Sequence, residues 1–138
     1  MTKALFHPNL IKIYHAYNQQ IRPYMTELEL SDGQPKILAY ISLHDGCLQK
    51  DLADWYAIKP ATVSRLLNHM EDQGLITRET PEGNRRITKV YITKKGTEKY
   101  QKFAQYRKAV DNMAFQGFTE EERTAFIGQL DRIRQNLL

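Results

Sequence analysis

The chain has 138 residues, of which 41% are hydrophobic and 26% charged. This length fits one domain and excludes two full-sized ones, and the composition is typical of a globular protein rather than a disordered one. The longest uninterrupted apolar run, residues 37–41, is far shorter than the roughly 18 residues that suggest a membrane span. With one cysteine and no export signal at the N-terminus, we expect a cytoplasmic protein without an internal disulfide.

Basic residues are concentrated in one part of the chain. Ten basic and three acidic residues lie between positions 78 and 108, whereas the rest of the chain has ten basic and thirteen acidic residues. A basic segment on a near-neutral body is what a polyanion-binding surface needs, although solvated basic faces are also common. Charge alone therefore leaves both a nucleic-acid partner and a solvated face open.

The N-terminal half has the apolar spacing of successive helices. Apolar residues recur at helical intervals from residue 6 to residue 28, and Pro23 is expected to kink or divide this helix. Ser31 and Gln34 form a predicted capping box, with Ser31 as the N-cap of a helix that stops near residue 45. A short helix is expected at Gln49–Tyr56, and Pro60 suits the first position of a helix that runs to about residue 73.

The C-terminal half begins with a change of period. Residues 75–79 and 87–92 are rich in β-branched side chains and predict two strands, joined by the turn-forming residues 80–85. Helical spacing returns after Thr93 and is broken at Gly117. Residues 119–122 then form a second predicted capping box, which opens the last helix.

These elements predict a mainly α fold with a small β-hairpin wing. A helix-turn-helix followed at once by a basic hairpin is a winged helix-turn-helix DNA-binding module, which we place at residues 31–93. The helices at 1–30 and 94–138 are too long for this module to bury alone. We therefore expect them to be dimerisation helices, whose apolar faces pack together and against a second subunit. The whole chain, 1–138, is then a single domain that forms a homodimer.

The helix after Pro60 has a polar face suited to DNA. Its predicted buried face carries Val63, Leu66, Leu67 and Met70, and the opposite face has no carboxylate before Glu71. A helix of this kind fits the major groove of double-stranded DNA, where an arginine can bind guanine bidentately. The alternative to DNA binding is a polar face that only meets solvent, and the alternative role for Arg65 is a phosphate contact. The predicted DNA-contacting residues of this helix are Ala61, Thr62, Ser64, Arg65, Asn68 and His69.

Further DNA contacts are predicted outside this helix. Gln49 starts the preceding helix, where main-chain amides and side chains often meet phosphates. Lys59 stands where a capping serine or aspartate would be usual, and a phosphate contact is one reason for its presence there. Arg85 and Arg86 lie at the tip of the hairpin, from which an arginine can enter the minor groove. The alternative is an exposed hairpin with solvated arginines.

Five segments, in this order, resemble the MarR family of bacterial transcriptional regulators: LQKDLA at 48–53, PATVSRLL at 60–67, EDQGLI at 71–76, NRR at 84–86 and ITKKG at 92–96. The resemblance implies a homodimeric winged-helix protein that binds a near-palindromic operator, usually represses transcription and is often released by a small molecule or oxidant. The family's wing usually carries Asp-x-Arg, whereas this chain has Asn84 and Arg86. Asn84 cannot form the ion pair that would hold Arg86, although it can accept a hydrogen bond.

The resemblance also implies a ligand site between the first, second and fifth helices. The candidate residues are Tyr14, His15, Tyr17, Arg22 and Tyr40. Aromatic walls with one arginine suit a small aromatic effector such as a carboxylate or a phenol. The alternative is that these tyrosines pack in the dimer with their hydroxyls hydrogen-bonded.

Other function classes find less support in the sequence. Cys47 is the only candidate for a thiol-based redox sensor, and a structural cysteine is the alternative. The four histidines are scattered, and the chain has no phosphate-binding Gly-rich loop, nucleophile elbow or paired-His motif. We therefore expect no metal, no cofactor and no enzymatic activity. A winged helix used for protein–protein contact is a further alternative, although such domains usually lack a basic wing.

Overall fold

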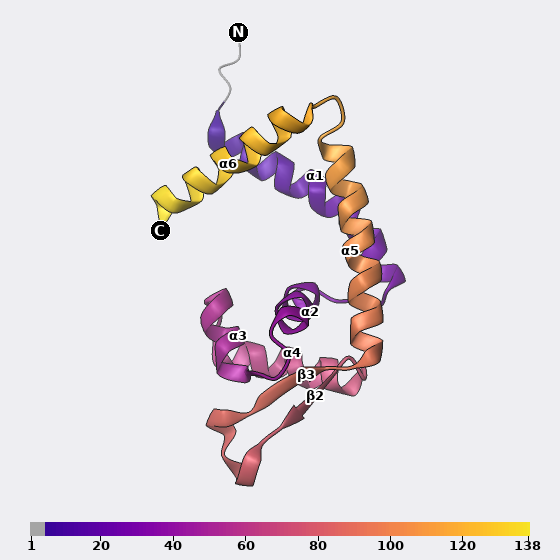
Figure 1. Cartoon of the computed structure of the whole chain (residues 1–138), viewed down its shortest axis with the longest axis vertical. Helices are drawn as coiled ribbons and strands as arrows, with labels where there is room; N and C mark the ends of the chain where they lie inside the picture. Colours follow the sequence, from indigo (N-terminus) through magenta and orange to yellow (C-terminus); the bar gives the residue numbers. More distant parts are fainter. Residues whose placement is uncertain (1–4) are drawn as a thin grey trace.

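The chain folds into an open arc, with a small module at one end and two helices at the other (Figure 1). This computed structural model describes residues 5–138, with the main chain alone at Arg85. The described helices are α1 (Phe6–Glu27), α2 (Gln34–Leu43), α3 (Gln49–Tyr56), α4 (Pro60–Asp72), α5 (Lys94–Ala114) and α6 (Glu120–Leu137). The described strands are β1 (Cys47–Leu48), β2 (Ile76–Glu79) and β3 (Lys89–Ile92).

The module consists of α2, α3, α4 and the sheet, packed around one apolar core. Every one of these elements except β1 contributes fully buried side chains, and α4 contributes Val63, Leu67 and Met70, each 0% exposed. The sequence predicts these three residues on the buried face together with Leu66, which is only half-buried and packs against the core. The other large apolar side chains that are almost completely buried are Ile37, Leu38, Ile41, Leu52, Leu75, Ile76 and Val90.

The sheet has three antiparallel strands in the order β1-β3-β2, with Val90 of β3 opposite both Cys47 and Arg78. The sequence predicts only two of them, because a strand of two residues carries no readable alternation. Both predicted strands are shorter than expected. Two 3-10 turns, Pro81–Gly83 and Arg85–Ile87, occupy the segment between β2 and β3.

The first half of the chain begins with one continuous helix, since α1 runs through Pro23 and is not divided there. Tyr24 of α1 stacks on Tyr106 of α5, with ring centroids 4.2 Å apart. Ile21 of α1 and Phe103 of α5 are both buried in the apolar core. The long helix α5 thus connects the module to the opposite end of the arc (Figure 1).

The start of α2 differs from the sequence-based expectation. Gly33, with a φ of 87°, is the N-cap, so Ser31 lies outside the helix. The side-chain oxygen of Gln34 nevertheless accepts a hydrogen bond from the main-chain N–H of Ser31 at 3.1 Å. The amide nitrogen of Gln34 donates to the side-chain oxygen of Gln73 at 2.9 Å, which joins the start of α2 to the end of α4.

The last helix, α6, opens with the predicted capping box. The Glu122 carboxylate accepts from the N–H of Thr119 at 2.9 Å, and the Thr119 hydroxyl accepts from the N–H of Glu122 at 3.1 Å. No residue of α6 is buried in the single chain. Of the helices described for residues 5–138, none has the length and apolar character needed to cross a membrane.

Candidate DNA interface

The outer face of α4 is the first part of the candidate interface. The packing of Val63, Leu67 and Met70 into the core turns the opposite side of this helix outward. In the described part of the chain, the Arg65 side chain has no hydrogen-bond or ion-pair partner, so its guanidinium is available to an external acceptor. All six predicted positions reach the surface: Ala61, Arg65, Asn68 and His69 are exposed, and Thr62 and Ser64 are half-buried.

Among the residues that the structure describes, no side chain caps the N-terminus of α4. Lys59 is the N-cap residue, in an extended conformation, and its carbonyl accepts hydrogen bonds from the N–H groups of Thr62 (2.9 Å) and Val63 (3.2 Å). Its side chain is exposed. A positive charge at this end opposes the helix dipole, whereas a bound anion is stabilised there. Lys59 therefore lies where a phosphate would relieve an unfavourable charge.

Arg78 is a residue of this surface that the sequence analysis did not select. Its guanidinium forms an ion pair with Glu71 at 3.2 Å and donates to the side-chain oxygens of Asn68 and Gln49. The side chain is only 17% exposed. The signal that could have found it is the alternation of β2, which puts Arg78 on the same face of the strand as the buried Ile76.

The contacts of Arg78 change the expectation for two predicted residues. Asn68 and Gln49 are both predicted to contact DNA, and the side-chain oxygen of each accepts a hydrogen bond from Arg78. The main-chain N–H of Gln49 also donates to the Thr88 carbonyl at 2.8 Å, which joins the start of α3 to the wing. The base of the recognition surface is therefore cross-linked to the sheet by hydrogen bonds.

The wing carries the second part of the candidate interface. The Asn84 side-chain oxygen accepts a hydrogen bond from the main-chain N–H of Arg86 at 3.1 Å, which is the acceptor role expected for an asparagine at this position. The Arg86 side chain is exposed. At the base of the wing, the hydroxyls of Thr80 and Thr88 are hydrogen-bonded at 3.0 Å. The predicted contact of the Arg85 side chain lies outside the described part of the structure.

A cavity of about 610 Å³ lies between α1, α2 and α5. The structure places Tyr14, Tyr17 and Arg22 on its wall, and places His15 and Tyr40 outside it. On α1 the wall follows one helical face, and His15 is off that face. The ring of Tyr40 instead packs 4.5 Å from the His44 ring. The other wall residues are Asn18, Ile21, Met25, Asp32, Gly33, Pro35, Lys36, Ala39, Tyr56, Phe103 and Arg107.

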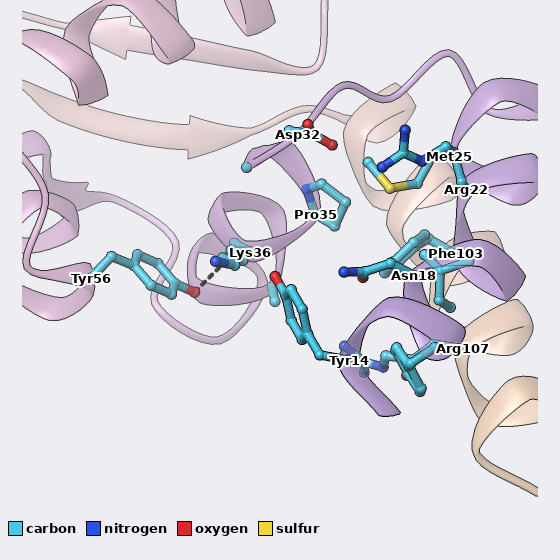
Figure 2. A pocket seen from close by; sticks show the side chains of 14 residues that line it. Tyr14, Asn18, Arg22, Met25, Asp32, Pro35, Lys36, Tyr56, Phe103 and Arg107 are labelled. Atoms are coloured by element: carbon cyan, nitrogen blue, oxygen red, sulfur yellow. Dashed lines mark hydrogen bonds between the residues drawn. The ribbon is translucent and has the colours of Figure 1, made fainter. Parts of the chain in front are cut away.

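The cavity has more positive than negative side chains, namely Arg22, Lys36 and Arg107 against Asp32. Figure 2 shows Arg22 and Asp32 near one end and Arg107 near the other, beside Tyr14. This charge balance and the aromatic walls suit an anionic aromatic ligand. The arginines are the residues able to bind a carboxylate bidentately.

Two tyrosine hydroxyls of the cavity are already used within the chain. Tyr17 donates to the Asp111 carboxylate at 2.7 Å, and burial together with this hydrogen bond raises the pKa of Tyr17 to about 12. Tyr56 donates to the main-chain carbonyl of Lys36 at 2.6 Å (Figure 2). Tyr17 therefore fits the alternative in which the tyrosine hydroxyls are hydrogen-bonded within the protein. Tyr14 is exposed, and its hydroxyl has no hydrogen-bond partner among the described residues.

Cys47 is half-buried in β1, with its main chain paired to β3. Burial, followed by the negative charges of Asp51 and Asp45, raises the pKa of the Cys47 thiol to about 11. A redox-sensing cysteine needs the reverse, a depressed pKa and access to solvent. This environment therefore favours the structural reading of Cys47. Within residues 5–138, no cluster of three or more His, Cys, Asp or Glu side chains offers a metal site.

The raised pKa of Cys47 makes its alkylation a direct test of thiol reactivity. Because only the thiolate reacts, we expect iodoacetamide at pH 8 to modify the native protein roughly 100-fold more slowly than the denatured chain, whose thiol has an ordinary pKa. The rates are measured by mass spectrometry, with the urea-denatured protein as the control. Equal rates in the two states would contradict this account and restore Cys47 as a redox candidate.

Comparison with known proteins identifies relatives of this chain. A sequence profile of the MarR family matches residues 28–87. The uncharacterized HTH-type transcriptional regulator YybA of Bacillus subtilis (strain 168) is 31% identical over 80% of this chain and 74% of its own length. The HTH-type transcriptional repressor MdtR of the same organism is 28% identical over 75% of this chain and 70% of its own length.

Solved structures with the same fold cover nearly the whole chain. A MarR-family transcriptional regulator from Silicibacter pomeroyi has 31% sequence identity and a TM-score of 0.77, over 96% of this chain and 90% of its own. A putative MarR-family transcriptional regulator from Listeria monocytogenes, complexed with 26mer DNA, has 25% identity and a TM-score of 0.83, over 98% of this chain and 90% of its own. The chain thus belongs to the MarR family of winged helix-turn-helix transcriptional regulators, which bind DNA and are not enzymes.

Proposed function

We propose that this protein binds a near-palindromic operator as a homodimer, with α4 in the major groove and the wing beside the minor groove. The observation that carries this proposal is that α4 has one buried face and one exposed polar face. One face is fully buried in the core, and the other holds Arg65, which has no partner among the described residues, between small and polar side chains. The residues proposed to contact DNA are Gln49, Lys59, Ala61, Thr62, Ser64, Arg65, Asn68, His69, Arg85 and Arg86.

The roles of the two principal arginines differ. Arg65 projects from a rigid helix, which suits bidentate binding of a guanine edge. Arg86 lies in a turn whose main chain is fixed by Asn84, which suits an arginine inserted into a narrow minor groove. A winged helix used for protein contact would instead expose apolar side chains on α4, whereas the exposed face of this helix is polar.

The proposed dimer interface is formed by the terminal helices. The first and last helices, α1 and α6, both lie at the end of the arc opposite the module (Figure 1). Large exposed apolar patches mark association surfaces, and each half of a two-fold dimer supplies the same patch. We assign residues 1–30 and 94–138 to dimerisation and residues 31–93 to DNA binding. The large apolar side chains exposed on α1 and α6 and at their ends are Leu5, Phe6, Leu10, Ile11, Ile13, Tyr14, Phe126, Ile127, Leu130, Leu137 and Leu138.

The bound protein is proposed to repress transcription and to be released by a small aromatic anion. The relative MdtR is named a transcriptional repressor, which supports this direction of regulation. The cavity wall includes Gly33 at the start of α2, and Leu66 of α4 approaches to 3.3 Å from where a Gly33 Cβ would stand. The adjacent Gln34 is hydrogen-bonded to Gln73. A ligand that displaces the start of α2 therefore acts directly on α4.

Replacement of the two arginines separates base reading from phosphate binding. Arg65→Ala is expected to lower operator affinity by about 1–3 kcal/mol and to leave nonspecific binding nearly unchanged. Arg86→Ala is expected to weaken operator binding and nonspecific binding alike, and to reduce the slope of log K against the logarithm of the salt concentration by about 1. Fluorescence anisotropy on an operator recovered from a random duplex pool measures both effects. Lys108→Ala, an exposed substitution on α5, is the control, and an unchanged operator affinity for Arg65→Ala would refute its role.

The dimer is tested by sedimentation equilibrium. At micromolar concentration the wild type is expected at twice the 16.2 kDa chain mass. A double substitution of Ile127 and Leu130 by Asp is expected to raise the dimer dissociation constant at least about 100-fold, because carboxylates would be buried in the interface. Gln129→Asp adds a charge to the same helix and is the control. A monomeric wild type would contradict the proposal.

The effector is tested with a panel of aromatic carboxylates and phenols. A ligand of the cavity is expected to raise the melting temperature, because it binds the folded state, and to weaken operator binding in the same concentration range. Arg107→Met is expected to abolish both effects, whereas Lys108→Met, its neighbour outside the cavity wall, is expected to keep them. A compound that stabilises the protein but leaves operator affinity unchanged would contradict the release mechanism.

A further inference from the structure

One guanidinium joins β2 to α3 and α4, the two helices that carry proposed DNA contacts. Arg78 of β2 donates from Nε and Nη2 to Glu71 (3.4 and 3.2 Å), from Nη2 also to Asn68, and from Nη1 to Gln49 (3.4 Å). These four hydrogen bonds engage most of its five N–H donors. With a side chain only 17% exposed, Arg78 has little capacity left for a phosphate.

The contact fixes the orientation of both amides. A guanidinium has donors and no acceptor, so the amide atom that faces it has to be the oxygen. For Asn68 and Gln49 this assignment therefore follows from chemistry rather than from the shape of the side chain, whose two ends are alike. Each oxygen faces Arg78, and each NH₂ group is the end that is left for another partner.

An asparagine with both ends available reads adenine, because its oxygen accepts from N6 and its nitrogen donates to N7. We propose that Arg78 is a specificity-setting positioning residue that makes the Asn68 amide a donor toward DNA. Asn68 then favours a base whose major-groove edge presents acceptors with no amino donor beside them, guanine first and thymine second, over adenine, whose N6 amino group stands beside N7. Gln49, held by the same guanidinium, likewise offers a donor, which suits a phosphate oxygen. This inference rests on the proposed function, since it concerns how α4 reads an operator.

The test is selection of bound sequences from a random duplex pool with wild type and variants. Asn68→Ala identifies the operator position that Asn68 reads, as the one position whose preference it loses. There we expect the wild type to prefer guanine or thymine over adenine about tenfold. Arg78→Met removes the donors that hold the amide, so adenine is expected to rise to within about threefold of guanine at this position alone.

Two further variants make the result decisive. Asn68→Asp keeps the shape and the acceptor for Arg78 but replaces the NH₂ group with an oxygen, and is expected to invert the preference toward cytosine or adenine. This variant needs no change at Arg78, so it decides the matter even where Arg78→Met unfolds. Lys89→Met removes a charge from the neighbouring strand β3, where the described residues give Lys89 no partner, and is expected to change no base preference.

Three results would overturn the assignment. The first is an Asn68→Asp variant with the base preference of the wild type. The second is a folded Arg78→Met variant with unchanged preference, or with weaker binding to all sequences and a shallower salt dependence, which indicates a phosphate contact. The third is an Asn68→Ala variant that loses no preference. A wild type that enriches no sequence would instead refute the proposed function, and the inference with it.

Discussion

The burial of Val63, Leu67 and Met70 is the constraint on which the DNA-binding surface depends. All three side chains of α4 are 0% exposed, and burial of each contributes roughly 1.5–3 kcal/mol. A helix held in this way cannot rotate about its axis without exposing them. The opposite face, with Arg65, is therefore fixed outward before DNA arrives, so little ordering remains for the binding step.

Polar contacts hold α4 from both sides of that core. Arg78 joins the middle of the helix to β2 and to the start of α3, while Gln73 joins its end to Gln34. The Arg78 contact is made by two proposed DNA-contacting residues, Asn68 and Gln49, and the Gln73 contact lies at the far end of the helix, so the two together set the position of the DNA-binding surface. The second contact also lies next to the cavity at the start of α2, which places ligand binding and base reading on the same helix.

Periodicity predicted the helices, the buried face of α4 and the wing, because each depends on residues close in the sequence. It missed β1, whose two residues pair only with a distant strand. It also did not predict the contacts of Arg78, such as its ion pair with Glu71. The charge distribution along the sequence placed Arg78 in the basic segment 78–108. In the structure its side chain lies on the same face of β2 as the buried Ile76. His15 and Tyr40 were chosen for their chemistry, but the direction of each ring depends on packing that spacing does not reveal.

The most direct test of the account is the symmetry of the sequence that the wild-type protein selects from random duplexes at moderate salt. Two identical recognition helices in a dimer predict a near-palindrome with half-site centres about 10 bp apart. Salt-sensitive binding without an enriched sequence would contradict base reading by α4, and an enriched sequence without internal symmetry would contradict the dimer.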